Sequence, residues 1–103
     1  MFCMVLTTAK GATTQKIIEA LLSQELAACI QTMPVSSHYV WQGRLQNEAE
    51  DLLLIKAKTS DWADLEAAIR AVHDYETPEI LRFDVDAGSS SYLDWIAQVT
   101  RRG

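Results

Sequence analysis

Of the 103 residues, 49% are hydrophobic, and only four are glycine and two proline, a balance typical of a compact globular chain. This length accommodates one domain, residues 1–103, and excludes two independent cores. Nine basic residues against fourteen acidic ones give a formal net charge of −5, which disfavours a nucleic-acid partner because no positive stripe faces a phosphate backbone.

The N-terminal residues 1–6 are continuously apolar and predict a strand covered on both faces. They resemble no signal peptide, and no apolar run approaches the roughly 18 to 20 residues that span a bilayer. We therefore expect a cytoplasmic protein without a membrane partner. Cys3 and Cys29 lie in apolar runs, which favours reduced, buried thiols, and Cys29 is kept as a minor candidate metal ligand.

After the first strand, apolar residues recur at helical spacing. Thr13 or Thr14 is predicted to cap an amphipathic helix that continues to about Leu26. Residues 28–33 begin a second strand, and Pro34 within its continuation predicts an edge, a bulge or a kink, since proline cannot donate to a ladder.

A long hairpin completes this half of the chain. The second strand resumes through Tyr39 and Trp41, and Gly43 marks a turn. Residues 51–58 predict the third, antiparallel strand. Trp41 and Tyr39 share one strand face, so we expect them to pack against a neighbouring subunit.

The second half begins with a helix capped by Ser60 that stops before Pro78. Residues 79–85 then alternate as a fourth strand with three apolar side chains predicted to face inward. These are Leu81, Phe83 and Val85. A last helix, capped by Ser89 or Ser90, carries an apolar face with Tyr92 and Trp95 as core or interface residues and a basic end at Arg101 and Arg102.

The order βαββαβ predicts an α+β, ferredoxin-like fold with two helices on one face of a four-stranded antiparallel sheet and an extra C-terminal helix. Leu52 and Leu54 point to the face opposite Leu53, and one terminal helix cannot cover that whole face. A long edge strand also needs a partner. We therefore predict an oligomer in which the hairpin around residues 35–55 pairs with another subunit.

Function is expected in two clusters, residues 38–43 and 73–79, where aromatic, ionisable and constrained residues gather. His73 is a candidate metal ligand, and Glu79 can complete or orient such a site or act with His73 in acid/base chemistry. The alternative is that His73 caps the second helix while Glu79 forms a salt bridge. His38 is most simply a solvated strand residue.

Several charged residues have two possible roles. Lys56 can pair with Glu79 or bind an anion in a cleft between subunits. The run of Glu48, Glu50 and Asp51 is predicted to be a solvated hairpin tip, although several copies in an oligomer can gather a hard cation weakly.

Five elements, in order along nearly the whole chain, resemble the CutA divalent-cation-tolerance family. They are Leu26-Ala27-Ala28-Cys29-Ile30, Tyr39-x-Trp41-x-Gly43, Leu54-Ile55-Lys56, His73-x-Tyr75-x-x-Pro78-Glu79-Ile80 and Tyr92-Leu93-x-Trp95. The resemblance implies a homotrimer of ferredoxin-like subunits, similar in architecture to the PII signalling proteins, with sheets packed around a three-fold axis. It also implies tolerance of copper and other divalent metals, with no settled catalytic activity.

The chain departs from the family pattern at sites that bear on function. Asp74 stands where a proline is usual, and Gln31 where an asparagine is common. Some bacterial relatives have a cysteine near the end of the first strand and adjacent histidines as candidate copper ligands. The matching positions here are Thr7, Val72 and His73, so one of the three is kept.

The leading hypothesis is a non-enzymatic, trimeric, metal-responsive protein, with copper the expected metal. Clefts between its subunits are then lined by Trp41, Lys56, Tyr75 and Glu79, with His73 nearby. The alternative is PII-like signalling through a small anionic ligand or a protein partner in the same cleft, although a glycine-rich phosphate cradle is missing. An enzyme using His73 and Glu79 lacks an activated nucleophile, and a structural trimer presenting its surface to a protein partner is also open.

Overall fold

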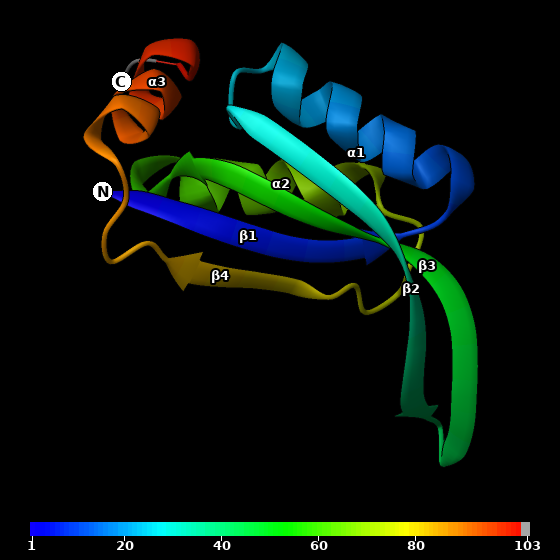
Figure 1. Ribbon diagram of the computed structural model, residues 1–103. Helices are drawn as coiled ribbons and strands as arrows, with labels where there is room; N and C mark the ends of the chain where they lie inside the picture. The colour runs from blue at the N-terminus through cyan, green and yellow to red at the C-terminus, as the bar shows by residue number, and fades with distance from the viewer. Residues whose placement is uncertain (102–103) are drawn as a thin grey trace.

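The computed structural model describes residues 1–101, so Arg102 of the predicted basic end lies outside the described residues. Figure 1 shows the elements in the order β1 (Phe2–Ala9), α1 (Gly11–Ser23), β2 (Cys29–Trp41), β3 (Arg44–Lys58), the short 3-10 helix η1 (Thr59–Asp61), α2 (Trp62–Val72), β4 (Ile80–Asp84) and α3 (Ser90–Val99). The predicted α+β order with an extra C-terminal helix is confirmed.

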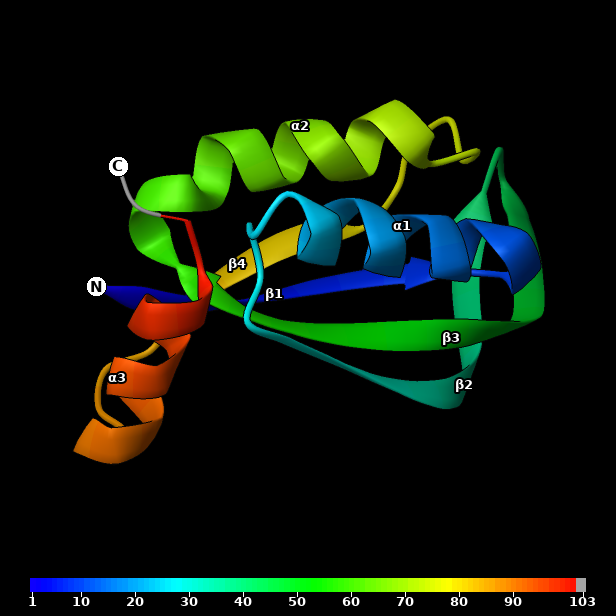
Figure 2. The same ribbon diagram turned by 90° about the horizontal axis from the view of Figure 1, so that it is seen from above.

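The sheet has the order β2-β3-β1-β4, and every neighbouring pair is antiparallel. Helices α1 and α2 lie side by side on one face, while α3 lies beyond the end of the sheet near the N-terminus (Figure 2). Side chains from β1, β3 and both helices form the core between these layers. The largest fully buried ones are Val5, Ile17, Leu21, Leu26, Leu53, Ile55, Leu65 and Ile69.

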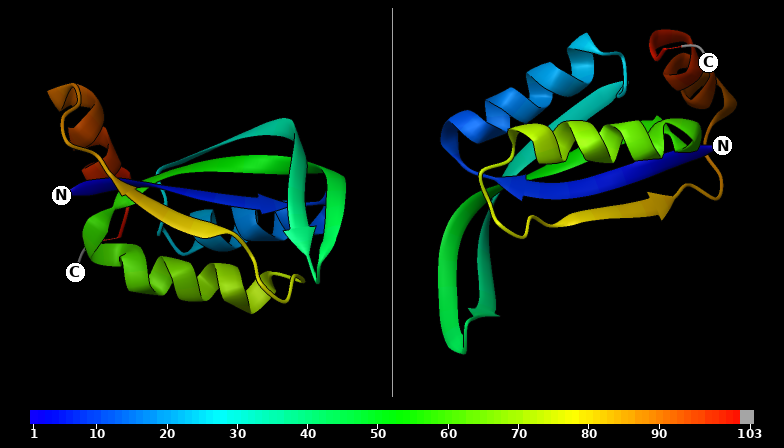
Figure 3. Two further views of the ribbon diagram at one scale, coloured as in Figure 1. Left: turned by 90° about the horizontal axis from the view of Figure 1, so that it is seen from below. Right: turned by 180° about the vertical axis from the view of Figure 1, so that it is seen from behind.

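The hairpin is longer than predicted. Strand β3 begins at Arg44 instead of residue 51, and the turn lies at Gln42 and Gly43, with φ of 52° and 76°. The predicted turn at Gly43 is therefore confirmed, while Glu48, Glu50 and Asp51 lie along β3, and their placement at a solvated tip is wrong. The distal half of the hairpin bends away from the two helices and projects from the domain (Figure 3).

Strand β4 presents its apolar residues to the face without helices. Leu81 and Phe83 are 50% and 48% exposed, so their predicted inward placement is wrong. Arg82 points to the other face, where its guanidinium lies 5.7 Å from the ring centre of Trp62 in α2. Alternation along a strand identifies the residues that share a face but does not say which face the helices cover.

The uncovered face of the sheet is apolar across three strands. Leu6 of β1 pairs with Leu54 of β3 and with Leu81 of β4, and Met4 pairs with Phe83. Directly paired residues point to the same side of a sheet, so these side chains form one continuous patch, which we call the open face. Within residues 1–101 no element lies over its centre (Figure 1).

The helices begin without the side-chain caps that the sequence predicts. Lys10 is the N-cap residue of α1, and Thr14 instead donates its hydroxyl to Asp51 Oδ2 at 2.8 Å, which ties α1 to β3. Asp61, and not Ser60, is the N-cap residue of α2. Ser89 occupies the N-cap position of α3, but its hydroxyl forms no capping hydrogen bond.

The described C-terminal residue is fastened to the start of α2. The guanidinium of Arg101 contacts the carboxylates of Asp61 and Asp64, and its backbone N–H donates to the carbonyl of Glu25. Asp61 is 5% exposed, so Arg101 supplies a partner for a buried charge. Among residues 1–101 every helix is too short or too polar to cross a membrane.

Candidate functional site

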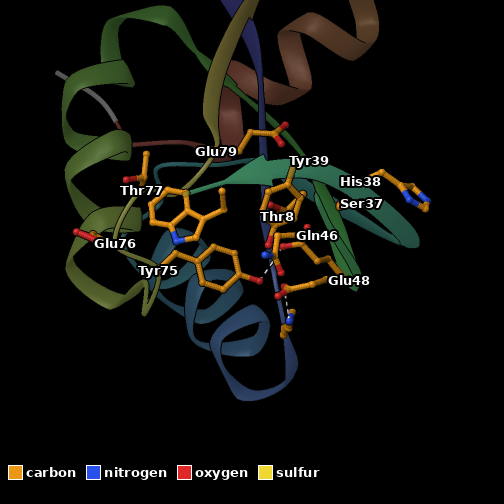
Figure 4. Close-up of a pocket in the computed structure, with 13 residues that line it drawn as sticks. Thr8, Ser37, His38, Tyr39, Gln46, Glu48, Tyr75, Glu76, Thr77 and Glu79 are labelled. Atoms are coloured by element: carbon orange, nitrogen blue, oxygen red, sulfur yellow. Dashed lines mark hydrogen bonds and ion pairs between the residues drawn. The ribbon is translucent and has the colours of Figure 1, made fainter. Parts of the chain in front are cut away.

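An open cavity of about 710 Å³ lies between the projecting hairpin and the loop that connects α2 to β4 (Figure 4). This volume is in the range of small-molecule sites. Thirteen residues line it: Thr8, Lys10, Ser37, His38, Tyr39, Trp41, Gln46, Glu48, Glu50, Tyr75, Glu76, Thr77 and Glu79. The two clusters predicted to carry function therefore meet in one place.

Tyr75 and Glu50, which both line this cavity, are joined by a hydrogen bond. The Tyr75 hydroxyl donates to Glu50 Oε2 at 2.7 Å, and Glu50 is only 9% exposed. Burial of the phenol, together with this bond to a carboxylate, raises the pKa of Tyr75 well above its ordinary value. Successive side chains of β3 point to opposite faces of the strand, so Glu50 faces the cavity while Ala49 and Asp51 face the other way.

The lysine of the cavity is already paired. Lys10 Nζ lies 2.5 Å from Glu48 Oε2, a contact that raises the pKa of Lys10 and lowers that of Glu48. The remaining carboxylates of the lining, Glu50, Glu76 and Glu79, have no ion pair within residues 1–101. The cavity is therefore acidic.

His73 lies behind the cavity and anchors the loop. Its Nε2 is 2.8 Å from the carbonyl oxygen of Thr8, and the backbone N–H of Tyr75 donates to its Nδ1 at 3.2 Å. Since a carbonyl only accepts, these contacts require the neutral ring with the proton on Nε2. The side chain is 1% exposed and its ring bonds to β1. His73 is also the C-cap residue of α2, as the alternative prediction has it, and its backbone N–H donates to the carbonyl of Ile69 at 3.0 Å.

The structure brings together three of the predicted cleft residues, Trp41, Tyr75 and Glu79. Lys56 lies near the opposite end of β3, where it donates to the side chain of Gln31, so it does not pair with Glu79 in this chain. Cys29 lies beside Tyr92 of α3, also remote from the cavity.

The residues of one chain do not fit a metal ion at the positions predicted from the sequence. The hydroxyl of Thr7 stands where a thiolate is needed, and it is buried without a hydrogen-bond partner in residues 1–101. Both ring nitrogens of His73 are already bonded. No group of three or more His, Cys, Asp or Glu side chains in this part of the chain is placed to hold a metal ion.

Glu50, Thr8 and Lys10 are site residues that the sequence did not predict. The sequence predicts Glu50 as part of a solvated acidic run, although its spacing of two from Glu48 puts both on the strand face that Tyr39 shares across the hairpin. That shared alternation was the available signal. No sequence signal identifies Thr8 or Lys10 as site residues, because neither is near the two clusters in sequence.

Replacing Tyr75 with phenylalanine is expected to reduce the loss of stability in alkali. A tyrosine whose pKa is raised on folding stabilises the folded state below about pH 10, its ordinary pKa, and this contribution is lost as the pH rises further. Urea unfolding at increasing pH measures the slope of the free energy of unfolding against pH. This slope should be flatter in Tyr75→Phe. The matched variant Tyr92→Phe, on a tyrosine that is 42% exposed, should change the slope less. Equal slopes in wild type and Tyr75→Phe contradict the assignment.

A family model described as CutA1 divalent ion tolerance protein matches residues 3–99. The chain is 34% identical over 97 residues to the divalent-cation tolerance protein CutA of Thermus thermophilus, covering 93% of this chain and 94% of that protein. It is 34% identical over 88 residues to the chloroplastic protein CutA of Arabidopsis thaliana, covering 84% of this chain and 48% of that protein. The chain thus spans about half the length of the plant relative.

A solved structure of the divalent cation tolerance protein CutA1 from Thermus thermophilus superposes with a TM-score of 0.92 at 35% identity. The alignment covers 98% of this chain and the whole of that one. Sequence and structure therefore agree on the same relatives.

Proposed function

Because this chain belongs to the CutA1 divalent ion tolerance family, we propose that it acts in the cellular response to divalent metal ions as a homotrimer that catalyses no reaction. The observation that supports this best is the acidic cavity at the base of the projecting hairpin. A cytoplasmic location stays a prediction.

The open face and the hairpin support the trimer. A contiguous apolar patch of this kind is unusual on a monomer and is typical of an interface between subunits. Strand β2 is an edge of the sheet throughout its length, so its outer backbone groups can pair with another chain. Three subunits that pack their open faces around one axis satisfy both requirements.

Copper is the metal we propose first, with other divalent cations as competitors. Since one chain lacks a group of three ligands within residues 1–101, a metal bound tightly by the trimer requires donors from more than one subunit. The carboxylates of Glu76 and Glu79 are available, because neither has an ion pair in the described residues.

We propose that the protein is not an enzyme because both ring nitrogens of His73 are hydrogen-bonded to the backbone. A general base needs a free ring nitrogen within reach of a substrate proton, whereas both nitrogens here hold the backbone. No serine or cysteine lies next to His73 as an activated nucleophile in residues 1–101 of the structure.

The second candidate is PII-like binding of a small ligand or a protein partner, which the size of the cavity favours. Its predicted anionic ligand is disfavoured, because four carboxylates and one lysine line this cavity and that lysine is paired with Glu48. Lys56, the other candidate for an anion, lies elsewhere on β3.

Calorimetric titration of the native protein with Cu(I), Cu(II) and Zn(II) tests the metal proposal. We expect saturable binding of Cu(II) and Zn(II) that weakens by about tenfold or more in Glu79→Gln, since this change removes a charged oxygen donor, whereas Cu(I) prefers sulfur ligands and should depend less on Glu79. Glu19→Gln, on the exposed side of α1, is the control and should bind as wild type does. His73→Gln shows whether the ring is released to the metal, and wild-type protein without saturable binding contradicts the proposal.

A further inference from the structure

We propose that the cavity at Glu50 binds an organic cation, a primary alkylammonium compound, by pairing its ammonium group with the Glu50 carboxylate. Glu50 is nine-tenths buried and lines the cavity. One of its oxygens accepts the hydrogen bond from Tyr75, and the other is not enclosed in residues 1–101 but is accessible from the cavity. A donor that enters the cavity can therefore reach this oxygen and form a charge-assisted hydrogen bond with it.

The chain supplies no cation to Glu50 within the described residues. Lys10, the lysine that lines the cavity, forms its ion pair with Glu48. Both ring nitrogens of His73 are engaged by the backbone, and His38 points away from the centre of the cavity (Figure 4). The charge at Glu50 is therefore available to a ligand.

Aromatic rings form the wall beside this charge. Tyr39, Trp41 and Tyr75 all line the cavity, and Figure 4 shows Tyr39 and Tyr75 on either side of its centre. Aromatic faces attract cations and also pack against a hydrocarbon chain. A carboxylate at the base with aromatic walls suits a ligand that has a charged amine and an apolar stem.

Other classes of ligand fit less well. Within one subunit a bare metal ion finds no group of three convergent donors in residues 1–101, so the metal proposed above needs donors from more than one subunit, whereas an ammonium group needs only the carboxylate of Glu50. An anion meets Glu48, Glu50, Glu76 and Glu79 together. A primary ammonium is preferred over a quaternary one because only the primary group carries N–H donors for the accessible oxygen of Glu50.

This inference rests on the proposed function in one respect, namely that the assembled trimer leaves the mouth of the cavity open to small molecules. The test therefore uses the native protein, with its mass measured by light scattering in the same sample. A trimer that binds no amine overturns the inference alone. A monomer overturns the proposed assembly, whatever it binds.

The experiment is a calorimetric titration near neutral pH with n-butylammonium and with 1,4-diaminobutane, beside tetramethylammonium and n-butanol as probes. We expect saturable binding of both primary amines and binding of the two other probes that is weaker by about tenfold or more. Glu50→Gln keeps the size of the side chain and an acceptor for Tyr75 but removes the charge, so amine affinity should also fall by about tenfold or more.

Glu19→Gln is the matched control. It removes the same charge from the exposed side of α1, away from the lining of the cavity, so amine affinity should stay within about twofold of wild type. Trp41→Leu provides a second variant should Glu50→Gln fail to fold, and it should weaken binding through the lost aromatic face. Primary amines that do not saturate, or that bind Glu50→Gln or Trp41→Leu as tightly as wild type, overturn the inference.

Discussion

Replacing Leu81 with aspartate is expected to convert the proposed trimer into a monomer. Leu81 lies on the open face, where it pairs with Leu6 next to Leu54, and half of its surface is exposed in the single chain. A carboxylate placed in an apolar interface has no partner there, and burying it without one is strongly unfavourable. The native mass should fall to the 11.5 kDa of one chain, which light scattering measures directly.

Leu22→Asp is the control for this change. Leu22 is also an exposed leucine, at 43%, but it lies on α1, away from the open face. Its replacement should leave the assembly intact. If both variants assemble like the wild type, the open face is not the interface.

Replacing Ile55 with alanine is expected to lower the free energy of unfolding by about 2 to 5 kcal/mol, the usual effect of a cavity in a packed core. Ile55 is fully buried between β3 and the helices, and it pairs with Val5 and Ile30 on the neighbouring strands. Urea unfolding at a fixed protein concentration measures the change, because assembly makes stability depend on concentration.

Leu54→Ala is the matched variant, because it removes the same number of carbon atoms one position along the same strand. Leu54 points to the open face, so its loss should weaken assembly more than the fold of each subunit. The account predicts a stronger concentration dependence of unfolding in Leu54→Ala than in Ile55→Ala. A larger loss of subunit stability in Leu54→Ala would reverse the assignment of the two faces.

The elements of the fold could be predicted from local pattern. The spacing of apolar residues predicts α1 and α2, and a continuous apolar run predicts β1. These patterns depend only on which side of an element is buried, so they can be seen in the sequence. The start of β3 was missed because residues 44–50 are mostly polar. They extend as a strand through their backbone pairing with β2, which needs no apolar alternation.

The candidate site could be predicted in part. Aromatic and acidic residues within two short clusters identified the cavity, and Trp41, Tyr75 and Glu79 do line it. The pairings inside the site could not be predicted, because Glu50 is 25 residues from Tyr75 and His73 is 65 residues from Thr8 in sequence. Such contacts are set by the packing of β3 and β1 against the loop after α2.

The role of His73 shows this limit most clearly. Its position after a helix and beside a carboxylate, Asp74, is equally typical of a ligand, a base or a helix cap. The structure shows His73 as the C-cap residue of α2, with a ring that also joins the backbone of β1 to that of its own loop. That arrangement makes His73 a support for the loop that carries Tyr75 into the cavity.

The native mass of the wild-type protein, determined by light scattering, tests the proposed assembly most directly. The account predicts three times the 11.5 kDa of one chain, about 35 kDa, at micromolar concentration. A mass of 11.5 kDa would contradict it, because the open face and the edge of β2 would then be exposed to water in the functional protein.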